Sequence, residues 1–182
     1  MLAGGRGSRL GQASKPAALL AGRPLLSYPV AALAAVCDRV AVVCKRGTEL
    51  PPLDGVERWD EPDEPQHPLA GIVFALSEAD GAPVLVCAAD MPFVTAEACR
   101  SLLGTPPKGA AVVAAADGVL QPTFGLYAGS ALETLRSAPM NGRLTDAVEA
   151  LDPTRVAFPA RLVQSVNTPE DLAEAEKLLA AA

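Results

Sequence analysis

The sequence predicts an α/β protein whose mostly parallel sheet is covered by helices on both faces. Short, continuously apolar segments alternate with segments of helical periodicity along the chain, as in parallel sheets built from strand–helix units. No linker-like stretch interrupts this alternation. A length of 182 residues suits one domain of ordinary size. Residues 1–182 are therefore interpreted as a single three-layer α/β/α domain.

The expected strands are short runs rich in Val, Leu and Ala, bounded by Gly, Pro or charged residues. Met1–Ala3 is a stub of a strand that runs directly into a glycine-rich loop, Gly4 to Gly11. A turn at Asp117-Gly118 makes the strand that follows it an antiparallel partner of the one before. The later strands are expected at Val40–Cys44, Val56–Trp59, Val84–Ala88, Ala110–Ala115, Thr123–Tyr127 and Val156–Phe158.

The expected helices have apolar residues at helical spacing and recognisable N-terminal signals. The first is expected to begin at Pro24, because proline is favoured at the first helical position. Thr95 is expected to cap the third helix and Thr168 the last, and Ser130 with Glu133 has the pattern of a capping box. Helices are thus expected at about 24–36, Leu69–Ala79, 96–103, from 130 onward, Leu144–Leu151, and from Thr168-Pro169-Glu170-Asp171 to the end.

The charge balance limits the partners. There are 15 basic and 21 acidic residues, a net charge of −6, which argues against a general nucleic-acid binder. No apolar run is long enough to cross a membrane, and no signal peptide is recognisable, so neither a membrane nor a nucleic-acid partner is expected. Four cysteines without a C-x-x-C pair predict reduced, mostly buried thiols in a cytoplasmic protein. The stretch Asp60–Pro68 is expected to be a loop, with Glu61–Glu64 solvated and mobile.

The scarce cations gather near the N-terminus. Arg6, Arg9, Lys15 and Arg23 lie within the first 25 residues with no acidic residue among them. Ligands of open α/β sheets bind outside the carboxyl ends of the strands, and the glycines that follow the first strand free successive amides to surround an oxyanion. Neither G-x-G-x-x-G nor a P-loop fits, since Leu10 stands where the third glycine belongs. The pattern predicts an anion site of another kind.

A second strand end carries a carboxylate. The segment V-L-V-C-A-A-D-M-P delivers Asp90 at the edge of an apolar core. Magnesium commonly takes one or two carboxylates and fills its other positions with phosphates and water. Asp90 beside a glycine-rich anion loop therefore suggests a magnesium–nucleoside triphosphate site; acceptance of amide hydrogen bonds at the turn before Pro92 is the alternative for this residue alone.

In combination, these residues resemble the molybdenum cofactor guanylyltransferases, the MobA-like family of the nucleotidyltransferase superfamily. The resemblance spans nearly the whole chain and rests on segments that occur in the same order in both. They are Leu2-Ala3-Gly4-Gly5, Ser8-Arg9-Leu10-Gly11 with Lys15, Asp60, Pro68-Leu69-Ala70-Gly71, Asp90-Met91-Pro92, and Asn167-Thr168-Pro169-Glu170-Asp171.

The resemblance implies a Rossmann-like nucleotidyltransferase fold. It further implies a Mg²⁺-dependent enzyme that transfers GMP from GTP to the terminal phosphate of molybdopterin and releases pyrophosphate. Arg9 and Lys15 would hold the triphosphate, and Asp90 would bind the magnesium. The residues implied for nucleotide binding are Leu2, Ala3, Gly4, Gly5, Lys15, Asp60, Gly71 and Asp90. Molybdenum-enzyme apoproteins or cofactor-insertion proteins would be partners.

Within this set, Asp60 would read the base, because a carboxylate can accept both the ring N–H and the exocyclic amine of guanine. Asn167 and Arg143 are the candidate residues for the acceptor substrate. The chain departs from the family pattern at His67, where the family has the first glycine of G-P-L-A-G, and at Ser165, where it has asparagine. Both positions concern the acceptor.

Three alternatives remain from the sequence. A cytidylyltransferase of the same cofactor usually has L-A-A-G where this chain has Leu2-Ala3-Gly4-Gly5. Sugar- or polyol-phosphate nucleotidylyltransferases share a similar opening, but the sugar enzymes usually continue to P-K-P and are longer. A non-catalytic nucleotide-binding module has less need of a metal-binding carboxylate.

Overall fold

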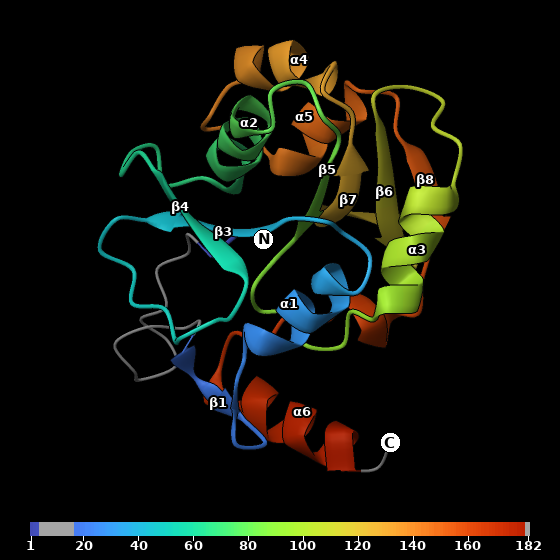
Figure 1. The fold of residues 1–182 in the computed structure, drawn as a ribbon. Coiled ribbons are helices and arrows are strands. Elements are labelled where there is room, and N and C mark those ends of the chain that lie inside the picture. Colours follow the sequence, from blue (N-terminus) through green and yellow to red (C-terminus); the bar gives the residue numbers. More distant parts are fainter. Residues whose placement is uncertain (4–16, 181–182) are drawn as a thin grey trace.

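The computed structural model describes residues 1–3 and 17–180 (Figure 1). Its strands are β1 (Leu19–Leu20), β2 (Arg23–Pro24), β3 (Val40–Lys45), β4 (Val56–Glu61), β5 (Val84–Cys87), β6 (Ala111–Ala116), β7 (Val119–Tyr127) and β8 (Thr154–Ala157). Its helices are α1 (Ser27–Ala34), α2 (Pro68–Glu78), α3 (Ala96–Gly104), α4 (Ala131–Ser137), α5 (Leu144–Glu149) and α6 (Pro169–Ala180), with a 3₁₀ turn, η3, at Ala160–Val163.

The N-terminal segment joins two groups of strands. β3 and β4 pair in parallel, and β5, β7, β6 and β8 form a sheet in that order. Leu2 lies between the groups and bridges in parallel to Val43 of β3 and to Ala88, which directly follows β5. Its amide donates to the Cys87 carbonyl (2.8 Å), and its carbonyl accepts from the Ala89 amide (2.9 Å). The Met1–Ala3 segment therefore acts as a short central strand, as the sequence predicts.

The sheet is mostly parallel, with one reversed strand, which confirms the predicted fold class. β7 runs antiparallel to both β5 and β6, whereas β6 and β8 are parallel. The predicted turn is present: Asp117 (φ 50°) and Gly118 (φ 78°) both adopt the left-handed conformation that a two-residue hairpin loop requires. β7 begins earlier than expected, because an irregularity beside Val113 and Ala114 accommodates Pro122 within the strand.

Helices cover both faces of the sheet (Figure 1). On one face α2, α4 and α5 enclose an apolar cluster that includes Leu69, Val86 and Val148. On the other face α1 and α3 enclose a larger cluster, with Leu33 and Leu102 among its members. Because successive residues of a strand point to opposite faces, β5, β6 and β7 contribute to both clusters.

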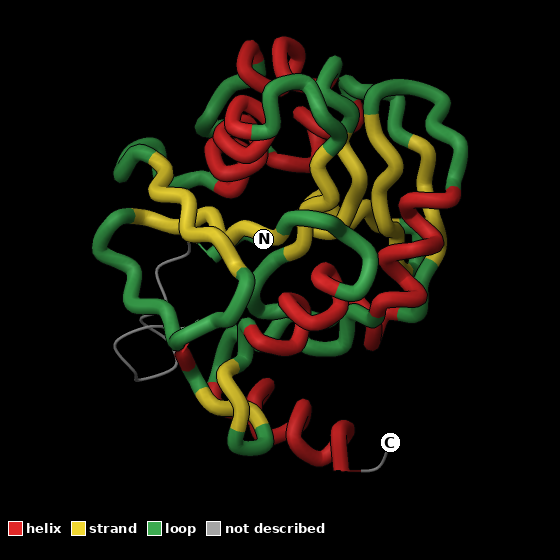
Figure 2. Tube along the Cα trace, viewed as in Figure 1, coloured by secondary structure: helices red, strands yellow, loops and turns green. Residues whose placement is uncertain are grey.

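The C-terminal helix belongs to a third apolar cluster. α6 packs against the β1–β2 hairpin, where Leu20, Leu25, Val166 and Ala175 are buried together (Figure 2). Here the predicted start of the first helix at Pro24 is wrong: Pro24 lies in β2 and α1 begins at Ser27. The hairpin turns at Ala21 and Gly22, both at positive φ. Because alanine seldom adopts that conformation, the sequence gives little sign of the turn.

Two of the three predicted helix caps form. Thr95 accepts from the Ala98 amide (3.2 Å), and Thr168 accepts from the Asp171 amide (3.1 Å). The capping box at Ser130 is wrong. Ser130 has helical backbone angles and its side chain makes no capping bond, while Glu133 accepts from Arg136 instead. An N-cap residue needs an extended backbone to turn its side chain onto the helix, and Ser130 lacks it.

Candidate functional site

The carboxyl ends of four parallel strands lie along one edge of the sheet. Lys45 ends β3, Glu61 ends β4, Ala3 follows the Leu2 bridge, and Asp90 follows β5 by three residues. The structure thus brings together Leu2, Ala3 and Asp90, which the sequence predicts to share a site. The predicted residues Gly4, Gly5, Arg9 and Lys15 lie outside the described residues. Ligands of open α/β sheets bind at such an edge.

Asp90 lies beside the C-terminal segment. Its carbonyl accepts a hydrogen bond from the Val166 amide (2.8 Å), which places Asn167 next to it along the chain. Asn167 is itself held by its amide, which donates to the Asp171 carboxylate (2.8 Å). Two of the predicted site residues, Asp90 and Asn167, are therefore neighbours. Arg143 directly precedes α5, which packs on β7 and α4.

Asp60 takes part in a network on the surface. Its carboxylate accepts from the Arg58 guanidinium (2.7 Å), and both side chains are more than a third exposed. Arg58 also donates to the carbonyls of Lys45, Arg46 and Thr48, the turn that follows β3. Arg58, which is paired with Asp60, therefore helps to hold this turn.

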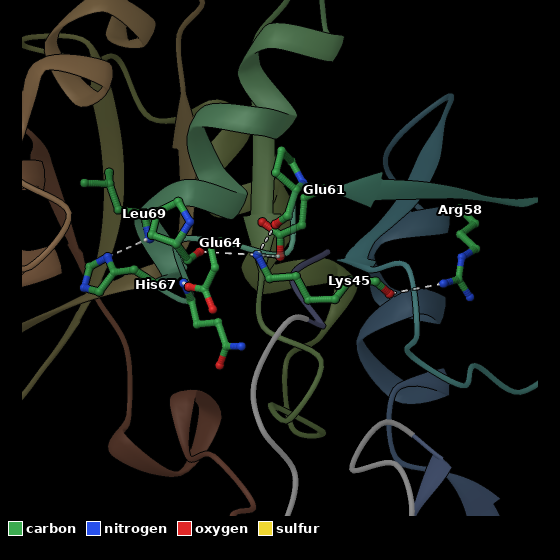
Figure 3. A network of polar contacts seen from close by, with 9 residues as sticks. Lys45, Arg58, Glu61, Glu64, His67 and Leu69 are labelled. Atoms are coloured by element: carbon green, nitrogen blue, oxygen red, sulfur yellow. Dashed lines mark hydrogen bonds and ion pairs between the residues drawn. The ribbon is translucent and has the colours of Figure 1, made fainter.

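Glu61 is buried, whereas its neighbour Asp60 is exposed and the sequence places Glu61 in a solvated loop. It is the last residue of β4 and only 6% exposed, so that expectation is wrong. Strand alternation explains the contrast: Asp60 and Arg58 share one face of β4, and Glu61 points to the face that α2 covers. Figure 3 shows its carboxylate next to the Lys45 ammonium, and the two charges are 3.5 Å apart.

Lys45 connects this carboxylate to the loop before α2. Its ammonium also donates to the carbonyls of Pro62 (2.5 Å) and Pro65 (3.3 Å), so each of its three N–H groups has an acceptor nearby. Lys45 and Glu61 are partners in the parallel β3–β4 register. The sequence predicts a functional role for neither residue. The available signal was a cation and an acid at the ends of two successive predicted strands.

Gly71 lies in the first turn of α2, opposite the Glu61 carboxylate. A Cβ atom there would lie 3.1 Å from Leu2 Cδ2 and 3.5 Å from Glu61 Oε2. The absence of a side chain at Gly71 therefore makes room for both residues. Burial among such neighbours raises the pKa of the Glu61 carboxyl, and the Lys45 charge opposes the rise.

His67 has a local structural role. It precedes α2 with extended backbone angles, and its Nδ1 accepts from the Leu69 amide (3.2 Å; Figure 3). This is the bond that a Ser or Asp side chain makes at other helix N-caps. The departure from glycine at this position thus supplies α2 with a cap.

Among the described side chains, the strand-end carboxylate of Asp90 is the candidate for binding a metal ion. No group of three or more His, Cys, Asp or Glu side chains within residues 1–3 and 17–180 is placed to hold a metal ion. The four cysteines are all free, three of them buried, and burial raises the pKa of Cys87 and Cys99. Asp90 supplies a hard carboxylate at a strand end. A single carboxylate fits magnesium, which retains water and phosphate ligands, and does not fit a closed zinc site.

No helix in the described part of the chain is long and apolar enough to cross a membrane.

The chain is similar to known enzymes over nearly its full length. It is 32% identical to a molybdenum cofactor guanylyltransferase of Cereibacter sphaeroides, over 98% of this chain and 95% of that one. It is 34% identical to a probable molybdenum cofactor guanylyltransferase of Deinococcus radiodurans, over 94% and 90% of the two chains.

Solved structures share the fold. The molybdopterin-guanine dinucleotide biosynthesis protein A of Archaeoglobus fulgidus superposes with a TM-score of 0.76 at 24% identity, covering 100% of this chain and 97% of that one. The 2-C-methyl-D-erythritol 4-phosphate cytidylyltransferase of Thermus thermophilus superposes with a TM-score of 0.73 at 22% identity, covering 97% and 96%. Such likeness identifies a nucleotidyltransferase fold without selecting a substrate.

The sequence pattern of the MobA-like NTP transferase domain matches residues 1–155, which include the strand ends that carry Leu2, Lys45, Glu61 and Asp90. Together with the full-length relatives, this match makes the protein a nucleotidyltransferase enzyme, a member of the MobA-like NTP transferase family.

Proposed function

We propose that this enzyme transfers GMP from GTP to the terminal phosphate of molybdopterin, with release of pyrophosphate. The observation that carries the proposal is the near-complete similarity to relatives named molybdenum cofactor guanylyltransferase, one of them 32% identical over 98% of this chain. The edge at which Leu2, Ala3 and Asp90 meet is in accord with it, since nucleotides bind at the carboxyl ends of strands in such folds.

Asp90 would bind Mg²⁺, which when bound neutralises charge on the nucleotide phosphates. Arg9 and Lys15 would neutralise the triphosphate and the departing pyrophosphate, and the amides of Gly4 and Gly5 would surround its oxygens. Phosphoryl and nucleotidyl transfers depend mainly on positioning and on such charge neutralisation.

Leu2, Ala3, Asp60 and Gly71 would form the nucleoside subsite. For Asp60 to read guanine, its carboxylate would have to accept from the base while it accepts from Arg58, or exchange one partner for the other. Gly71 would act through the space that it leaves for Leu2.

The acceptor would lie on the Asp90 side of the edge, where Asn167 is held beside the Asp90 carbonyl. Arg143 is the second proposed acceptor residue. Molybdenum-enzyme apoproteins or cofactor-insertion proteins would receive the product, in the cytoplasm.

The test is an assay of pyrophosphate release with Mg²⁺, molybdopterin and each nucleoside triphosphate in turn. We expect release with GTP, much slower release with CTP, and a guanine dinucleotide product identified by mass. Glu57→Gln, which alters an exposed acid of β4, is a matched control for Asp90→Ala, which should abolish release. Release with CTP that equals or exceeds that with GTP would refute the guanylyl assignment.

A further inference from the structure

Lys45 makes contacts that the proposed function leaves unexplained. It ends β3, and its ammonium lies 3.5 Å from the Glu61 carboxylate and donates to the carbonyls of Pro62 (2.5 Å) and Pro65 (3.3 Å). The Lys45 side chain is only 16% exposed. Burial of a lysine costs side-chain entropy and hydration, and here acceptors from one short stretch of chain offset that cost.

The residues that Lys45 holds belong to the connection from β4 to α2. Pro62 to Gln66, here called the β4–α2 loop, are all exposed and lie in neither a helix nor a strand. Pro62 and Pro65 have no amide to donate, and the Gln66 amide donates to the Glu64 carboxylate within the loop (3.2 Å). The two bonds from Lys45 therefore attach the β4–α2 loop to the end of β3.

The β4–α2 loop leads directly into the first turn of α2, at the carboxyl edge of the sheet. His67 follows the loop and caps α2 by accepting from the Leu69 amide (3.2 Å). In the same turn Gly71 approaches the central segment, since a Cβ there would lie 3.1 Å from Leu2 Cδ2. In Figure 3 the Lys45 side chain points from β3 toward this loop and the start of α2. The position of the loop thus governs how α2 meets Leu2, a residue of the proposed nucleoside subsite.

The contacts of Lys45 also indicate how it acts. Each of its N–H groups has an acceptor nearby, so its charge is not held in reserve for a phosphate. The Glu61 side chain that faces it is its partner in the β3–β4 register and is 5% exposed, which suits a counter-charge packed within the protein. Lys45 therefore acts on the β4–α2 loop and not on a bound ligand.

We propose that Lys45 is a positioning residue: by holding the carbonyls of Pro62 and Pro65, it fixes the β4–α2 loop and the first turn of α2 in the arrangement that binds GTP. This inference rests on the proposed function and deepens it, because it names a residue outside the nucleotide-binding set on which GTP affinity depends. A site that is correctly arranged for only a fraction of the time loses affinity in proportion to that fraction. Loss of Lys45 should therefore weaken GTP binding and leave the rate of transfer from bound GTP unchanged.

The experiment measures nucleotide binding without an acceptor, so that it does not depend on turnover. The dissociation constants of GTP and CTP are determined by calorimetry with Mg²⁺ for the wild type and for variants of Lys45. Lys45→Met should raise the dissociation constant of GTP about 10-fold, the value for a loop that is correctly placed about one-tenth of the time. Lys45→Arg keeps the charge and several N–H donors, so most of the affinity should return. Lys45→Gln keeps one NH₂ donor and should bind GTP with an affinity between those of the wild type and Lys45→Met.

Two further variants separate the loop from the ion pair and from stability. Glu61→Gln leaves Lys45 an amide oxygen as acceptor and should change GTP affinity less than about 2-fold. Leu102 is fully buried in α3, on the opposite face of the sheet, so Leu102→Ala should destabilise the protein and keep the wild-type affinity. Thermal unfolding identifies a temperature at which every variant is folded.

Amide hydrogen exchange tests the position of the loop directly. The Ala70 amide donates to the His67 carbonyl in the first turn of α2 (3.0 Å). Its exchange should be faster in Lys45→Met than in Leu102→Ala, because only the first variant releases the loop that precedes this turn. Equal exchange in the two variants would contradict a role of Lys45 in holding the loop.

The outcomes separate the inference from the proposed function. Wild-type GTP affinity in folded Lys45→Met, or an equal loss in Leu102→Ala, would overturn the inference and leave the proposed function intact. A loss in Glu61→Gln as large as that in Lys45→Met would also overturn it, because the ion pair and not the loop would then set the affinity. A wild-type protein that binds CTP as tightly as GTP would contradict the proposed function, whatever the effect of Lys45→Met.

Discussion

Replacement of Lys45 by methionine tests the ion pair at the ends of β3 and β4. Methionine matches the length of the lysine stem but leaves Glu61 without its cation, and it leaves the carbonyls of Pro62 and Pro65 without their donor. Removal of one partner of a buried pair costs about 3 to 5 kcal/mol. The Lys45 side chain is 16% exposed and that of Glu61 5%, so water relieves part of this cost. We expect a loss of about 3 kcal/mol in the free energy of unfolding.

The assay is urea unfolding at neutral pH, analysed by linear extrapolation, with thermal unfolding as a second measure. In a chain of this length about 3 kcal/mol corresponds to a fall in Tm of about 6 to 12 °C. The control is Arg39→Met, because Arg39 pairs with Glu57 at the surface, where the side chains are 70% and 43% exposed. That variant should lose less than about 1 kcal/mol.

The double variant Lys45→Met with Glu61→Gln sharpens the test. Once the carboxylate is neutral, loss of the cation should cost less, and the double variant should be more stable than Lys45→Met alone. If Lys45→Met loses no more stability than Arg39→Met, or if the second change gives no recovery, the pair is not the buried contact described above.

Three more predictions concern stability. Burial raises the pKa of Glu61 above its usual 4.5, so just above that pH the folded state binds more protons than the unfolded state. The free energy of unfolding of the wild type, measured in urea relative to Glu61→Gln, should therefore fall as the pH rises from 4.5 through the raised pKa. A difference between the two proteins that does not change with pH would contradict this. Tyr127→Phe removes the buried hydroxyl that donates to the Pro122 carbonyl (2.6 Å) and should lower the free energy of unfolding in urea by about 1 to 2 kcal/mol, whereas an unchanged value would mean that the bond adds nothing. Asp171→Ala removes the acceptor of the Asn167 and Thr168 amides. It should lower the free energy of unfolding by about 1 kcal/mol and speed amide hydrogen exchange in α6. Exchange as slow as in the wild type would argue against the cap.

Much of the fold follows from sequence patterns that a single segment carries. Continuous apolar runs locate β3, β5 and β6 to within about two residues, and local side-chain signals locate the caps at Thr95 and Thr168. The antiparallel β7 follows from Asp117-Gly118, since few other residue pairs adopt two successive positive φ angles.

Features that depend on distant contacts are harder to predict. The β1–β2 hairpin is stabilised by α6, whose residues lie about 150 positions later in the chain, so Pro24 looks like the start of a helix when it is considered alone. The capping box at Ser130 fails for a local reason, because Ser130 adopts helical backbone angles in place of the extended ones that a cap requires. At the hairpin, local propensity yields to tertiary packing.

The site shows the same division. Leu2, Ala3, Asp90 and Asn167 follow from motif and strand order, and the structure places them along one edge. Glu61 could not be distinguished from the acidic, proline-containing segment that follows it, because its burial results from the packing of α2 and from the space at Gly71. Composition alone describes this segment as solvated.

The most direct test of guanylyl transfer is to identify the product that the purified protein forms from GTP and molybdopterin in the presence of Mg²⁺. We expect a molybdopterin guanine dinucleotide and one pyrophosphate per product, with formation abolished in Asp90→Ala and preserved in Glu57→Gln. Failure of the folded wild-type protein to form this product, or equal formation in Asp90→Ala, would contradict the assignment of guanylyl transfer to this edge of the sheet.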